Sequence, residues 1–197
     1  AARRAELKEA MARRGVKQAA SHGMSRTTGS LLVVNLAEPL VSLGRRDEAL
    51  AVIERALEQD PPPTYRASLR MLAGEVMLAR GDLAGARAAL AAKELLTTYG
   101  YRGPQDLFAL LRLQAAVLLA EGRPSEVPAA IEPLFTMVGL PDDSRYAWPV
   151  LVHAAHAAGQ AGDTAALAAI EERAAGLLTK TPLQRAYHLT YQAARSG

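Results

Sequence analysis

Hydrophobic residues recur every three or four positions along most of this 197-residue chain, and polar residues fill the positions between them. The run Val33, Leu36, Ala37 and Leu40 is one example. This spacing places the apolar side chains on one face of an α-helix, so the pattern predicts an all-α fold. We expect a first helix near residues 2–14, helix pairs near 30–43 and 46–59, 64–80 and 83–97, 105–121 and 124–138, and 144–160 and 163–178, and a last helix near 183–195.

A short motif repeats between the paired helices: a glycine, then polar residues, then an alanine-rich segment. Its glycines are Gly44, Gly81, Gly122 and Gly162, which are 37, 41 and 40 residues apart. We expect each glycine to end a helix in the left-handed region, with Asp47, Asp82 or Asp163 favouring the start of the next helix. The repeating unit is therefore a helical hairpin.

The first hairpin carries the fullest repeat signature. Its positions are Val33, Leu36, Ala37 and Leu40 in the first helix, then Ala49, Ile53 and Ala56 in the second, followed by Pro61. This order of large and small residues resembles the tetratricopeptide repeat (TPR). The resemblance implies a right-handed superhelix of hairpins in which small residues let neighbouring helices approach closely. The wider spacing predicts insertions in the loops, because a minimal unit has about 34 residues.

Prolines test this assignment. Pro39, Pro128 and Pro133 fall inside predicted helices, where each removes a backbone donor, so we expect kinks and an irregular third hairpin. Pro124 occupies a first turn, where proline is tolerated.

We expect residues 1–197 to form a single TPR-like domain of about four hairpins with an unpaired helix at each end. Unpaired end helices suggest a piece of a longer chain. The segments 35–38, 43–49, 60–63 and 78–83 resemble the repeat region of large ATP-binding LuxR-type transcription regulators of bacteria. That resemblance implies a sensor that controls the parent's ATPase and DNA-binding domains in cis. Neither a P-loop motif nor a helix-turn-helix signature is visible in the sequence itself.

The amino-acid composition excludes several kinds of functional site. Half of the residues are hydrophobic, 22% are charged and there are no cysteines, which excludes disulfides, thiolate metal sites and cysteine nucleophiles. No apolar run approaches the roughly 20 residues of a membrane span, so we expect a cytoplasmic protein without a membrane partner. We also expect no cofactor.

The net charge of +3 reflects basic residues that are concentrated near the N-terminus, among them Arg13, Arg14 and Lys17. A nucleic-acid-binding arm is one interpretation. We favour a solvated helix face, because Glu6 and Glu9 alternate with the basic residues, and we expect no direct nucleic-acid binding.

In a TPR stack the first helices line a concave groove, which is the expected binding site for a protein, a peptide or a small-molecule effector. The predicted groove residues are Asn35, Glu38, Glu75, Arg112, His153 and His156. A carboxylate clamp for peptide C-termini is not expected, since Val34 and Glu38 stand where basic and amide groups are needed.

Two further features have two interpretations each. His153 and His156 have a spacing that suits metal ligation, but no further ligand can be assigned, and we expect ordinary groove histidines and no metal. The loop residues Tyr99, Tyr101 and Arg102 form either a contact surface or packing over helix ends.

Near the fourth hairpin, Asp142, Asp143 or Ser144 is expected to cap a helix, and Trp148 to pack in the core. No triad, paired carboxylates or phosphate loop has supporting context, so we expect no enzyme.

The leading functional hypothesis is therefore a sensor or interaction module of a LuxR-type regulator. A free-standing TPR adaptor that binds a peptide in its groove is the alternative. Exposed end helices would also allow pairing with a second copy of the chain.

Overall fold

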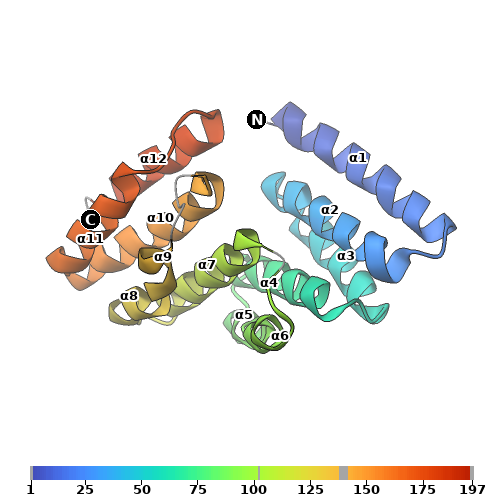
Figure 1. Cartoon of the computed structure of the whole chain (residues 1–197), viewed down its shortest axis with the longest axis horizontal. Helices are drawn as coiled ribbons and strands as arrows, with labels where there is room; N and C mark the ends of the chain where they lie inside the picture. The colour runs from blue at the N-terminus through green and yellow to red at the C-terminus, as the bar shows by residue number, and fades with distance from the viewer. Residues whose placement is uncertain (1, 102, 138–141, 196–197) are drawn as a thin grey trace. The chain divides into compact units, whose positions relative to one another are not determined.

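The computed structural model describes residues 2–101, 103–137 and 142–195. These residues form helices joined by short loops, and no strand occurs among them, which confirms the all-α prediction. The chain divides into two compact units, Ala1–Arg102 and Gly103–Gly197 (Figure 1). Each unit has its own set of packed helices. The right-handed superhelix of the TPR type and the single repeat domain over residues 1–197 stay predictions.

In unit 1 the helices α1 to α4 are antiparallel and each packs against the next, and the short helices α5 and α6 both pack against α4 (Figure 1). Its helical elements are α1 (Ala2–Ser21), the π-helical η1 (Ser25–Gly29), α2 (Ser30–Ser42), α3 (Arg46–Glu58), α4 (Pro63–Ala79), α5 (Leu83–Ala89) and α6 (Ala92–Tyr99). Because α1 and α3 both run antiparallel to α2, they point in the same direction along their shared neighbour.

Small residues bring the helices of unit 1 together. Ala37 of α2 and Ala49 of α3 are completely buried, as their place in the repeat signature predicts. Gly15 of α1 faces Leu32 of α2, and a Cβ added at Gly15 would lie 3.2 Å from both Leu32 methyl carbons. The absence of a side chain at Gly15 thus sets the close approach of α1 to α2.

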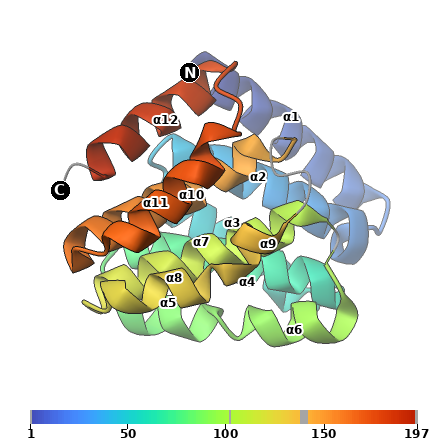
Figure 2. The ribbon, with the colours of Figure 1, turned by 60° about the vertical axis from the view of Figure 1, so that its left-hand side comes forward.

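Unit 2 is organised around its longest helix, α10, which packs against α7, α11 and α12 (Figure 2). Its helical elements are α7 (Pro104–Ala120), the 3₁₀ turn η2 (Pro124–Glu126), α8 (Val127–Ala130), α9 (Glu132–Thr136), α10 (Ser144–Ala161), α11 (Thr164–Ala175) and α12 (Pro182–Ala194). The buried face of α10 is rich in alanine, so helices can pack on several sides of it.

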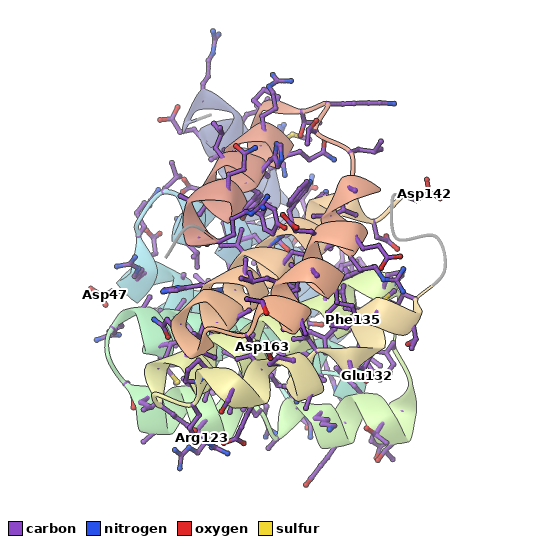
Figure 3. The ribbon with its side chains drawn as sticks, turned by 90° about the vertical axis from the view of Figure 1, so that its left-hand side faces the viewer. Asp47, Arg123, Glu132, Phe135, Asp142 and Asp163 are labelled. Carbon is purple, nitrogen blue, oxygen red and sulfur yellow. The ribbon has the colours of Figure 1, made fainter. Side chains whose placement is uncertain are left out.

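The turns between paired helices form as predicted. Gly44, Gly81, Gly122 and Gly162 all have positive φ, between 65° and 83°. The Asp82 and Asp163 carboxylates then cap α5 and α11, accepting hydrogen bonds from the backbone N–H groups three residues later at 2.8 and 2.9 Å. Figure 3 labels Asp163 at the start of α11. The repeated motif is therefore a repeated turn geometry.

The third hairpin is irregular, as its prolines predict. The expected helix near 124–138 is divided into η2, α8 and α9. Pro124, Pro128 and Pro133 each lie in the first turn of one of these short elements, where no intrahelical partner is lost. By contrast, the helix α2 continues past Pro39 to Ser42. Residues 138–141 lie outside the described part of the chain.

Other boundaries differ from the predictions. The first helix extends to Ser21, beyond the predicted end near residue 14. The π-helical η1 that follows it is not predicted by the sequence pattern. The expected helix near 83–97 is interrupted between α5 and α6. Among the described residues, no helix combines the length and apolar character that crossing a membrane requires.

Candidate binding groove

A groove in unit 1 lies between α1 and α3, with α2 as its floor. It has a volume of about 550 Å³. The residues that line this α1–α3 groove are Arg13, Val16, Lys17 and Ala20 of α1, Ser25 and Gly29 of η1, Val33 and Leu36 of α2, Val52, Arg55 and Ala56 of α3, and Gln59, which follows α3.

The lining residues have the same spacing along both walls of the groove. On α1 the lining residues begin at Arg13 and on α3 at Val52, and in both helices they follow at the third, fourth and seventh positions. This spacing describes one continuous helix face. Parallel faces of α1 and α3 thus oppose each other across the Val33 and Leu36 side chains.

Apolar groups dominate the surface of the groove, and three cationic side chains line it. Arg13 donates hydrogen bonds from its guanidinium to Glu9, at 2.7 Å, and to Glu48. Lys17 and Arg55 differ from Arg13, because neither makes an ion pair with any carboxylate in the described part of the chain. Within the described residues the Arg55 guanidinium donates to one acceptor, the backbone oxygen of Ala51, at 3.2 Å. Two exposed positive charges are thus available beside apolar walls.

A network of four charged residues joins the walls beside Arg13. Arg45, which precedes α3, donates to Glu9 at 2.7 Å and to Glu48 at 2.9 Å, and Arg13 bonds to the same two carboxylates. The hydrogen bond from Arg13 is the largest cause that lowers the pKa of Glu9, and the same holds for Glu48. Both carboxylates therefore stay ionised, and the network of Glu9, Arg13, Arg45 and Glu48 holds α1 against the start of α3.

A second connection joins η1 to the loop that follows α3. The Arg26 guanidinium donates to the Asp60 backbone oxygen at 2.5 Å and to its carboxylate at 3.0 Å. Arg66 donates to the same carboxylate and to the Pro61 oxygen at 3.1 Å. Asp60 has a positive φ of 49°, so this turn holds a conformation that asparagine and aspartate tolerate better than most residues. Charged contacts thus fix the helices at both ends of the groove.

The predicted groove residues of unit 1 do not line this groove. Asn35 and Glu38 are exposed on α2. At 100° per residue, they project from the side of α2 nearly opposite Val33 and Leu36. The predicted binding surface on α2 thus lies on the face away from this groove, and it stays a prediction. Glu75 lies half-buried on α4, outside the groove lining, and is engaged in interactions of its own.

In unit 2 the structure brings three other predicted residues together. His153 and His156 of α10 and Arg112 of α7 are close enough to interact electrostatically. Burial, and then the positive charges of Arg112 and His156, lower the pKa of His153 to about 4. His156 is exposed and its Nε2 lies 2.9 Å from the Gln160 side-chain nitrogen. No group of three metal-ligating side chains occurs among the described residues.

The aromatic loop is accessible where it is described. Tyr99 is 60% exposed and Tyr101 is 44% exposed. Arg102, the third predicted residue of this surface, lies outside the described residues. The contact surface stays a prediction.

Trp148 packs in the core of unit 2, as predicted. It is 1% exposed, and its indole N–H donates to the Leu178 backbone oxygen at 2.9 Å. The capping prediction holds for position only: Asp143 is the N-cap residue of α10, but its side chain makes no capping hydrogen bond. Ser144 Oγ instead accepts a hydrogen bond from the Leu178 N–H at 2.8 Å, because Ser144 is buried beside the segment after α11.

Sequence reasoning missed the cationic groove, although the signal was present. Val16, Lys17 and Ala20 follow Arg13 at helical spacing. The prediction treated the N-terminal basic residues as one solvated face, which holds for Lys8 and Arg14 but leaves out the face shared with α3. Only the packing of α1 against α2 separates the two faces.

Comparisons with protein-family models, curated proteins and solved structures found no match to this chain.

Proposed function

We propose that this chain is a non-catalytic binding module that receives an effector or a partner in the α1–α3 groove. The observation that carries the proposal is the combination of an apolar floor with two cations, Lys17 and Arg55, that have no carboxylate partner among the described residues. Binding sites are typically concave and mostly apolar, with a few polar groups that fix orientation. Nothing in the groove resembles a nucleophile with its base, so its chemistry is recognition.

We further propose that the module is the sensor region of a bacterial LuxR-type transcription regulator. The repeat motifs and their turn geometry support this context, together with a groove built between α1 and the α2–α3 hairpin. Binding in the groove bridges α1 and α3, so an occupant would change the packing of α1 on this hairpin. Such a change is a physical route from a bound effector to an ATPase or DNA-binding domain in the same chain.

The reading frame on both sides of residues 1–197 tests the regulator assignment. We expect a P-loop motif upstream and a helix-turn-helix downstream. If both are absent, the regulator proposal is wrong, and a free-standing TPR adaptor becomes the better assignment.

A groove-filling substitution tests the binding role in the intact parent. Ala20 is an exposed groove residue of α1, and Ala10 is an exposed residue of the same helix that does not line the groove. We expect Ala20→Trp to change the ATPase rate or the promoter affinity of the parent by about five-fold or more, as an occupied effector site would. Ala10→Trp is the matched control. If the two variants have equal activities, the groove has no regulatory role.

A further inference from the structure

We infer that the α1–α3 groove selects a linear aliphatic carboxylate, with the alkyl chain on the apolar floor and the carboxylate beside Lys17 and Arg55. This inference rests on the proposed binding function and specifies its ligand class. It is argued from the apolar lining, the charge balance and the size of the groove.

The lining gives a continuous surface for an alkyl chain. Six of the twelve lining residues carry aliphatic or methyl side chains, and they come from all three helices: Val16, Ala20, Val33, Leu36, Val52 and Ala56. Val33 and Leu36 are nearly buried within the protein, so their groove-facing atoms form a fixed floor. Aromatic residues are absent from the lining, and a flexible saturated chain suits methyl-lined walls better than a flat ring does.

The charges of the groove have one sign. Its lining includes Arg13, Lys17 and Arg55 but no aspartate or glutamate. Glu9 and Glu48 already compensate the Arg13 guanidinium, which leaves Lys17 and Arg55 as the cations without carboxylate partners. A ligand carboxylate would supply the missing charge, and hydrogen bonds between ionised partners are about twice as strong as neutral ones.

The helix register places these two cations near the same part of the groove. Arg13 contacts Glu48, and α1 and α3 run in the same direction. Lys17 is one turn beyond Arg13, and Arg55 is about two turns beyond Glu48. Along the helix axes the two residues are therefore offset by about one helical turn, on opposite walls of the groove.

The size of the groove favours a small ligand over a helical peptide. Its volume of about 550 Å³ lies in the range of small-molecule sites. The lining of each wall spans seven residue steps, or about 10 Å. An alkyl chain of about eight carbons matches this length, whereas a peptide helix is itself about 10–12 Å wide and would place only one face in the groove.

The direct test is a methyl-detected NMR titration of the 197-residue chain with octanoate. We expect octanoate to shift the methyl signals of Val16, Val33 and Val52 and to leave Val150, in the core of unit 2, unchanged. Octan-1-ol and octylammonium are the matched neutral and cationic probes, and we expect both to bind about ten-fold more weakly or worse. Hexanoate should bind more weakly than octanoate, by about four-fold for each methylene removed.

Charge-reversal variants at Lys17 and Arg55 test the role of these two cations in octanoate binding. We expect Lys17→Glu and Arg55→Glu each to weaken octanoate binding by about ten-fold or more. Arg14→Glu makes the same charge change on an exposed part of α1 outside the groove and should leave the affinity within about two-fold. Lys17→Gln and Arg55→Gln serve as milder variants, and far-UV circular dichroism confirms that each variant is folded.

The possible results separate the inference from the proposed function. Octan-1-ol binding as tightly as octanoate, or octanoate binding that survives Ala20→Trp, would overturn the inference. Suppose instead that octanoate fails and an acidic amphipathic helix of about 14 residues binds the chain but not Ala20→Trp. The carboxylate inference is then wrong and the binding function stands. If neither probe binds, both proposals fail.

Discussion

The two units attach their outer helices by different chemistry. In unit 1, charged residues connect α1 to α3 through the network of Glu9, Arg13, Arg45 and Glu48. In unit 2, aromatic rings connect α12 to α10: Trp148 lies 5.2 Å from the His188 ring centroid and 5.7 Å from that of Tyr191. Ion pairs hold two helices at their edges and leave space between them, whereas the tilted rings of Trp148, His188 and Tyr191 fill that space. The charged connection between α1 and α3 is in the unit that has the groove, where α1 is otherwise packed on α2.

This contrast also predicts how each unit is stabilised. Burial of large aromatic side chains contributes more to folding than exposed ion pairs do, and salt does not screen it. The α10–α12 contact should therefore be strong and insensitive to salt. The α1–α3 contact should be weaker and more adjustable.

The largest expected effect on stability comes from removing the Trp148 side chain. Trp148→Ala should destabilise unit 2 by about 4 kcal/mol, because it empties a core position and removes the hydrogen bond to Leu178. Hydrogen exchange measured by mass spectrometry resolves the two units, and protection should fall in α10 and α12. Trp148→Phe keeps a ring but not the indole N–H and should cost about 1–2 kcal/mol less than the alanine variant. Equal losses of protection in α1 and α3 would contradict a contribution specific to unit 2.

Much of this architecture follows from sequence periodicity, because helix position depends on local patterns. The four turn glycines and the two capping aspartates are predicted directly, and so is the burial of Ala37 and Ala49. Local patterns do not determine which face of a helix meets a third helix. The site residues Asn35 and Glu38 stay a prediction, and the structure lines the α1–α3 groove with residues from α1 and α3 that are distant in sequence.

The Tyr191 side chain illustrates the same limit. It is 3% exposed, and its hydroxyl has no hydrogen-bond partner among the described residues. Burial raises its pKa above the ordinary value of a phenol. No sequence pattern distinguishes this tyrosine from the half-buried Tyr187 one turn earlier. Its environment depends on the packing of α12 against α10.

An intermediate effect on stability is expected from substituting His153, and its size depends on pH. The folded-state pKa of about 4 lies below the ordinary value of 6.5. As pH falls below about 6.5, the unfolded chain binds a proton at this residue and the folded chain does not, so stability is lost down to about pH 4. His153→Gln should reduce this acid-induced loss by about 2 kcal/mol after allowing for solvent screening.

Urea unfolding of unit 2 at pH 7 and pH 4, followed by the fluorescence of Trp148, measures this effect, since the chain has one tryptophan. His22→Gln, which removes an exposed imidazole from unit 1, is the control. An unchanged pH profile in His153→Gln would show that another group causes the acid sensitivity. The Nε2 and Nδ1 signals of His153 give an independent titration curve.

The smallest effect is expected from the ion-pair network of unit 1. Glu9→Gln removes one carboxylate that accepts from both Arg13 and Arg45, and should destabilise the attachment of α1 by about 1 kcal/mol or less at low salt. The difference from the wild type should shrink in 1 M salt, where the screening length is about 3 Å. Hydrogen exchange of α1 provides the measurement, and Glu6→Gln, on the exposed surface of the same helix, is the control. A loss that persists in 1 M salt would indicate that Glu9 acts through packing and not through charge.

The four hairpin glycines have a consequence for synthesis. At Gly44, Gly81, Gly122 and Gly162, an added Cβ would meet no other atom within 4 Å, so backbone handedness is the only obstacle to a side chain. A D-amino acid has the mirror-image preference and favours positive φ. D-Alanine at these positions would restrict the unfolded chain and would match the positive φ of the folded backbone. Chemical ligation of such segments would give a stiffer version of the same protein, in which each hairpin turn is rigidified separately.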